Sequence, residues 1–123
     1  MASELRVTTI ANNAGSESVG TTYVVNGSAK QWTNFNQTNH STRDSHNQSS
    51  LTDDGAGLST INFANSMNNA NYCVHNTKGN EGNRGFHSVR STATGNYKID
   101  SRQETGSETD ASIQMCNVHG DLA

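Results

Sequence analysis

The sequence contains no proline, and large apolar side chains are scarce. Hydrophobic residues make up 30% of the 123 residues and charged residues 15%, and both fractions lie below those of ordinary globular domains. Disordered chains usually carry a high net charge or are enriched in Pro, Lys and Glu. With no proline and a net charge of -3, this chain lies outside that class, so we expect a folded domain with a small core.

Long basic and long apolar stretches are also missing. The Lys and Arg residues are scattered, so no patch suited to phosphate groups forms, and we expect no nucleic-acid partner. No apolar run is long enough to cross a bilayer, so no membrane insertion is expected. The opening MASELRVTTI lacks the basic and apolar regions of a signal peptide, which favours a cytosol-like compartment.

Motifs that carry chemistry are absent as well. Cys73 and Cys116 do not have metal-ligand spacing, and the sequence favours two buried free thiols, with a disulfide between neighbouring strands as the alternative. The five histidines show neither H-x-H nor H-E-x-x-H spacing, although one histidine per chain could still bind a metal on a symmetry axis. No serine lies in G-x-S-x-G. We therefore predict no enzyme activity, no catalytic residue, no metal and no cofactor.

Short β-branched and aromatic clusters between Gly- and Asn-rich turns predict strands. The expected strands span residues 30–36, 43–52, 58–63, 71–77, 86–93, 97–103 and 111–118. Helical periodicity is absent, and only residues 64–70 could form one helical turn. The predicted fold is an all-β, small antiparallel β-sandwich of jelly-roll-like type. Its predicted core residues are Trp32, Phe35, Ile61, Phe63, Tyr72, Val74, Ile113 and Met115.

Residues 1–29 are predicted to form an arm ahead of the domain at residues 30–123. Two apolar clusters are separated by ANNAGSESVG, which has turn and linker composition. Such a segment cannot build a core, so we expect an extended arm that packs on its own body, on sister chains or on another protein. The predicted anchor and assembly residues are Leu5, Val7, Ile10, Tyr23 and Val25.

Three polar loops are candidate contact surfaces, with an ordinary solvated loop as the alternative for each. The first is the Gly-rich tip at residues 53–57, which lacks the spaced oxygen ligands of a calcium loop and is predicted to be a hairpin turn. The other two are residues 78–84 and 103–110. The candidate receptor-facing residues are Asp53, Asp54, Gly55, Lys78, Asn80 and Arg84.

Five short motifs occur in a characteristic order. They are KQWTNFN at 30–36, RDSHNQSSLTD at 43–53, TINF at 60–63, NANY at 69–72 and NVHGD at 117–121. In this order and spacing they resemble the C-terminal module of tail fibres of tailed bacteriophages of the marine or cyanophage type. The resemblance extends from about Lys30 to Ala123.

The resemblance implies a structural protein of the virion, assembled in the host cytoplasm. It implies a homotrimeric, short fibre-like knob that is attached through the arm to a tail, baseplate or capsid protein. Many weak contacts on one particle would bind a host-surface glycan or envelope protein. The low apolar content also favours an oligomer, with Ile113 and Met115 in its seam. The alternatives are a capsid decoration, cement or head-fibre protein that stabilises the capsid surface, and a secreted carbohydrate-binding domain.

Overall fold

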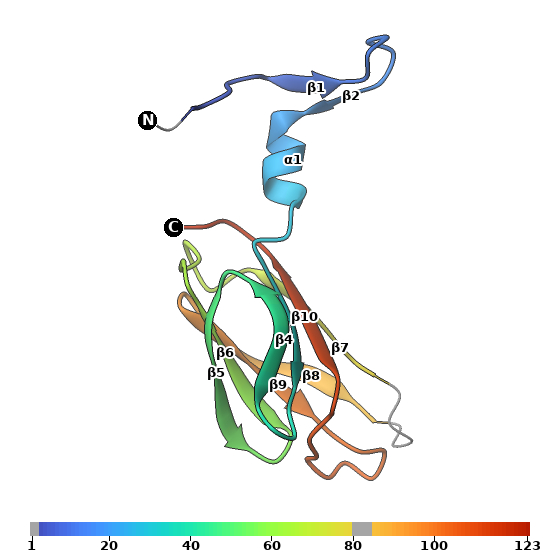
Figure 1. The fold of residues 1–123 in the computed structure, drawn as a ribbon, viewed down its shortest axis with the longest axis vertical. Helices are drawn as coiled ribbons and strands as arrows, with labels where there is room; N and C mark the ends of the chain where they lie inside the picture. The colour runs from blue at the N-terminus through green and yellow to red at the C-terminus, as the bar shows by residue number, and fades with distance from the viewer. Residues whose placement is uncertain (1–2, 80–84) are drawn as a thin grey trace.

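The computed structural model describes residues 3–79 and 85–123. A β-sandwich body carries a slender arm at one of its ends (Figure 1). The arm contains β1 (Thr9–Ala11), β2 (Ser18–Gly20) and α1 (Thr21–Gly27). The body strands are β3 (Gln31–Asn36), β4 (Ser41–His46), β5 (Gln48–Gly55), β6 (Leu58–Phe63), β7 (Cys73–Lys78), β8 (His87–Ala93), β9 (Asn96–Ser101) and β10 (Gln114–His119).

The body consists of two four-stranded antiparallel sheets. Their strand orders are β4-β3-β10-β7 and β5-β6-β9-β8. Hairpins join β3 to β4, β5 to β6 and β8 to β9, whereas β10 pairs with β3 on one side and β7 on the other. The predicted all-β antiparallel sandwich is confirmed.

The core lies between the two sheets and contains both apolar and polar side chains. Phe35, Cys116 and Val118 come from one sheet, and Ile61, Phe63, Tyr97 and Ile99 from the other. The ring of Phe63 lies 5.6 Å from the rings of both Tyr72 and Tyr97, measured between centroids. The Tyr97 hydroxyl donates to Oε1 of the buried Gln31 at 2.9 Å, which joins the two sheets by a buried hydrogen bond.

Five of the eight predicted core residues are buried or partly buried. Phe35, Ile61 and Phe63 are buried, and Tyr72 and Val74 are partly buried against them. Trp32, Ile113 and Met115 were wrongly predicted to be core residues, because they are 39%, 37% and 37% exposed. Successive side chains of a strand point to opposite faces, so Trp32 and Phe35, three positions apart, cannot both point inward. The buried apolar residues that the sequence analysis missed are Met67, Tyr97, Ile99, Ala111 and Val118, whereas the predicted burial of Cys116 is confirmed.

The single strand predicted over residues 43–52 is wrong, because the chain turns within it. β4 ends at His46, Asn47 has φ of 54°, and β5 begins at Gln48 in the other sheet. The Asn47 amide nitrogen donates to the carbonyls of Lys30 and Asn65 at 3.1 Å each, and its Oδ1 accepts from Asn65 N at 2.7 Å. Asparagine tolerates positive φ, so this one residue moves the chain from sheet to sheet.

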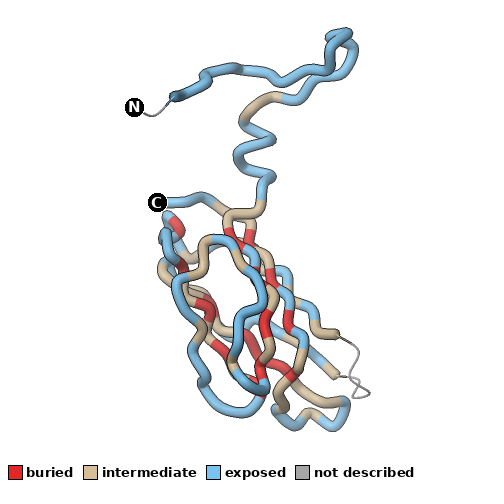
Figure 2. Tube along the Cα trace, viewed as in Figure 1, coloured by how far each residue is buried: buried red, intermediate tan, exposed pale blue. Residues whose placement is uncertain are grey.

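The arm is not extended as predicted, but a hairpin followed by a helix. β1 pairs with β2, and α1 follows at once, whereas residues 64–70 contain no helix. Figure 2 shows that the buried residues lie in the body and that the arm is exposed along almost its whole length. Helix α1 contains no buried residue, so within the described residues little apolar packing holds it.

Candidate functional site

The two ends of the sandwich differ in what they carry. The arm and the C-terminus lie at one end, and the turns after β3, β5 and β9 lie at the other (Figure 1). We call this second end, made of residues 37–40, 53–57 and 102–110, the distal end. The structure therefore brings the predicted loops 53–57 and 103–110 together. Asn80 and Arg84 of the third predicted loop lie outside the described residues.

The tip of the β5–β6 hairpin is fastened to the loop after β9. Gly57 N donates to Asp110 Oδ1 at 2.7 Å, and the Gly57 carbonyl accepts from Ser101 N at 2.8 Å. Gly57 has φ of +72°, and a Cβ there would lie 2.3 Å from the carbonyl oxygen of Ser101. Only glycine fits this close approach of two backbones. On the other side of the same loop, Lys78 Nζ donates to the Arg102 carbonyl at 3.1 Å.

The acidic residues of the tip are paired within the protein. Asp53 Oδ1 accepts from Gly55 N at 2.9 Å, the contact of an Asx turn, and its Oδ2 lies 3.4 Å from His40 Nδ1. Asp54 accepts from Thr60 at 2.5 Å and lies 3.2 Å from Lys98 Nζ. Burial raises the pKa of Asp54, but the hydrogen bonds from Thr60 and Lys98 outweigh it and lower that pKa below its ordinary value.

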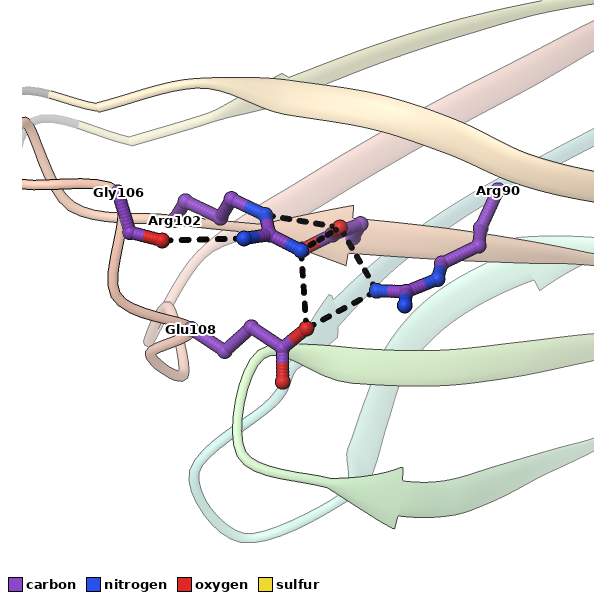
Figure 3. Close-up of polar contacts among 5 residues, drawn as sticks. Arg90, Arg102, Gly106 and Glu108 are labelled. Carbon is purple, nitrogen blue, oxygen red and sulfur yellow. Dashed lines mark hydrogen bonds and ion pairs between the residues drawn. The ribbon is translucent and has the colours of Figure 1, made fainter.

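Two arginines and two carboxylates fix the loop after β9 (Figure 3). Arg102 binds Asp100 Oδ2 through Nη2 at 2.9 Å and Glu108 Oε1 at 3.0 Å. Arg90 Nη1 reaches the same two oxygens at 3.1 and 2.9 Å. Asp100 is buried, and Arg102 also donates to the Gly106 carbonyl at 3.1 Å. The two arginines and the two carboxylates neutralise one another within this network. The distal end as a whole is acidic, because its residues include five carboxylates and one arginine, Arg102.

The outer face of the sheet β4-β3-β10-β7 is the second candidate surface. In the strand register Trp32 lies between His46 and Asn117, and His75 follows Asn117. In the next row, Asn34 lies between Asp44 and Met115. We call this surface the Trp32 face and define it by Trp32, Asn34, Asp44, His75, Met115 and Asn117, which line one open depression of about 650 Å³. That volume lies within the ~300–1,000 Å³ of small-molecule sites.

The same sheet carries both cysteines of the chain and the histidines His75 and His119. Cys73 and Cys116 are free, as the sequence favoured, but Cys73 is exposed and not buried as predicted. Cys116 is buried, and burial raises the pKa of its thiol to about 12. Cys73 Sγ lies 3.6 Å from His75 Nε2, and the His75 and His119 rings lie 5.7 Å apart between centroids. Residues 3–79 and 85–123 contain no group of three ligands able to hold a metal ion.

All five predicted anchor residues are exposed. In the segment leading into and through β1, the exposed fractions are 85% for Leu5, 42% for Val7 and 49% for Ile10. In α1 they are 79% for Tyr23 and 60% for Val25. Val7 O and Thr8 O accept from the hydroxyl of Thr21 at 2.9 and 3.2 Å, which holds the start of α1 against the hairpin. Leu5, Val7 and Val25 line one open groove there.

The described residues thus offer an apolar arm, a polar distal end and a lateral face with an exposed tryptophan. No helix among them is both long and apolar enough to span a membrane. Comparisons with known protein families, with curated proteins and with solved structures found no match for this chain.

Proposed function

We propose that this protein is a structural component of a tailed-bacteriophage particle, a short fibre-like knob held by its arm and projecting its distal end. The observation that carries the proposal is the arm, whose large apolar side chains are exposed at the end of the body opposite the distal loops. The motif order from Lys30 to Asp121 supports the phage assignment.

The arm is too small to be stable without a partner. β1 and β2 have three residues each, and an isolated two-stranded hairpin is at best marginally stable. Helix α1 has seven residues, several of them β-branched, and Gly20 at its N-terminus provides no side-chain cap. Burying Tyr23 and Val25 in an interface would contribute roughly 1.5–3 kcal/mol each. The arm is therefore an assembly element whose partner completes it.

The proposed partners are sister arms and a second virion protein. Three copies joined through their arms would place three bodies side by side with their distal ends directed away from the particle. The loops 53–57 and 102–110 then meet the host surface, and many copies on one particle multiply a weak affinity.

A capsid decoration or cement protein is the second candidate. The exposed arm favours it equally, because the same apolar side chains could bridge capsid subunits. The position of the protein on the particle separates the two candidates, so labelled copies should be located on intact virions by electron microscopy. Label on the tail supports the knob, and label distributed over the head supports decoration.

The test of the anchoring role uses tagged copies supplied during infection. The full chain should enter particles, whereas deletion of residues 1–29 or the double change Tyr23→Ser and Val25→Ser should abolish incorporation. The deleted chain should still fold, because every residue of the core cluster lies between positions 35 and 118. Phe86→Ser is the matched control, because Phe86 is 63% exposed and lies outside the arm. Normal incorporation of the deleted chain would refute the proposal.

A further inference from the structure

We infer that the Trp32 face binds a neutral oligosaccharide, one pyranose ring of which stacks on the Trp32 indole. This inference adds to the proposed knob a ligand-binding surface on the side of its body, separate from the distal end, and in that sense it rests on the proposed function. The binding itself is a property of the folded body and can be measured on the isolated protein.

The position of Trp32 is the first argument. A tryptophan is costly to leave in water, yet Trp32 is 39% exposed on the outer face of a central strand. Its direct partners in the register, the exposed His46 and the half-buried Asn117, are both polar, and Met115 of the adjacent strand lines the same depression. The face of an indole carries partial negative charge and attracts the C–H groups of one side of a sugar ring.

The polar groups around the indole are the second argument. Asn34 Oδ1 accepts from Arg43 Nη1 at 3.2 Å and Asp44 Oδ1 accepts from Ser45 N at 2.9 Å, so the only side-chain oxygen of Asn34 and one of the two carboxylate oxygens of Asp44 are already bound. Within the described residues Asn117 Oδ1 is buried without a hydrogen-bond partner. Sugar hydroxyls donate and accept at once, and amide and carboxylate groups are their natural partners.

Charge on this face favours an uncharged ligand. Asp44 contributes one carboxylate, and Arg43, the extra residue where the register of β3 and β4 shifts, contributes one guanidinium. The two charges balance, so neither a polyanion nor a polycation gains from binding here.

A second copy of the chain fits this face less well. The sheet has four strands of about six residues, and the usual spacings give an area of roughly 400 Å². A stable protein interface takes about 800 Å² from each partner. Trp32 and Met115 are the large apolar side chains on this face, whereas the arm carries many more. A small ligand is therefore the better occupant.

The chain contains one tryptophan, so its fluorescence reports on this face directly. The full chain should be titrated with maltotriose, cellotriose and triacetylchitotriose up to millimolar concentration. At least one of these should shift the Trp32 emission and protect it from iodide quenching. By calorimetry, Trp32→Ala should weaken binding by about tenfold, the equivalent of one stacking contact, and Trp32→Phe should recover part of the loss.

Phe86→Ala is the matched control, because it removes an exposed aromatic ring from another part of the body and should leave affinity unchanged. The inference is overturned if none of the three sugars binds, or if Trp32→Ala binds as tightly as the parent. It is also overturned if Trp32→Ala lowers the oligomeric mass, because the face would then be an interface between copies.

Failure of this inference can be separated from failure of the proposed function. The double arm variant Tyr23→Ser and Val25→Ser should lose incorporation into particles yet retain sugar binding. If the unchanged protein enters particles but binds no sugar, only the ligand assignment is contradicted. If the unchanged protein binds sugar and the arm variant still enters particles, only the anchoring role is contradicted.

Discussion

At the scale of single residues, alternation along a strand decides which apolar side chain is buried. The sequence QWTNFN predicts a strand, but it offers two aromatic rings on opposite faces. Phe35 is buried and Trp32 is not, although both are large aromatic residues that the sequence analysis placed in the core. The inward positions next to Phe35 are Gln31 and Thr33, so polar residues that look like surface residues in the sequence belong to the interior.

This assignment predicts losses of stability of different size for two aromatic truncations. Tyr97→Ala should lower the free energy of unfolding by about 3–5 kcal/mol, because it leaves a cavity and removes the hydrogen bond to Gln31. Trp32→Ala should cost roughly 1 kcal/mol, because the ring is already partly in water. Urea denaturation followed by circular dichroism measures both. A larger loss for Trp32→Ala would contradict the placement of the ring.

The two cysteines should differ in reactivity. Cys73 is exposed, whereas Cys116 is buried and burial raises its pKa to about 12, so at pH 8 it is almost entirely the unreactive thiol. A disulfide reagent should therefore titrate one thiol per native chain and two after unfolding. Cys73→Ser should abolish the native reaction, and Cys116→Ser should leave it unchanged. Two fast thiols in the native protein would contradict the burial of Cys116.

At the scale of elements, most strands could be predicted and the arm could not. β3, β6, β7, β8 and β9 lie within a few residues of their expected positions, because apolar residues alternate between Gly- and Asn-rich turns. The helix α1 was missed because TTYVVNG combines β-branched residues with neither a cap nor an amphipathic stripe. The turn at Asn47 was missed because both flanking strands are polar.

The positions of the loops in the sequence could be predicted from composition, but their proximity in the fold could not. Contacts such as Gly57 N to Asp110 join residues far apart in the sequence. The Arg and Asp residues of the ionic network are likewise dispersed over β8, β9 and the following loop. Spatial convergence of this kind depends on the strand order, which alternation alone does not determine.

The ionic network predicts a ranking of two arginine substitutions. Arg102→Ala removes contacts to Asp100, Glu108 and the Gly106 carbonyl, and should lower the free energy of unfolding by about 1–2 kcal/mol after allowance for solvent screening. Arg90→Ala should cost less, because Arg102 still neutralises the buried Asp100. Urea denaturation at low and high salt measures both. Equal losses would show that the two arginines are interchangeable.

At the scale of the whole molecule, the separation of arm and body bears on oligomeric state. Three exposed arms joined by Leu5, Ile10 and Tyr23 would bury side chains that the monomer leaves in water. The seam predicted earlier around Ile113 and Met115 is a separate surface of the body, and the trimer proposal does not require it.

Light scattering coupled to size exclusion should give a mass near three times the 13.2 kDa of one chain. Deletion of residues 1–29 should yield a folded monomer, because the deletion removes the apolar residues of the arm while the core cluster is intact. Phe86→Ser should leave the trimer mass unchanged. A single-chain mass that persists at high concentration would contradict the trimer, and a trimeric deletion variant would place the seam on the body.

The position of β10 has a consequence for the order of folding. β3, at residues 31–36, pairs along one edge with a strand synthesised about eighty residues later, and β7 pairs with that same strand. Neither early strand can complete its hydrogen bonds until residues 114–119 have left the ribosome. Contacts this distant in sequence slow folding, so the nascent body remains open until these residues have emerged. Its arm emerges first and is free to meet other nascent arms during that interval.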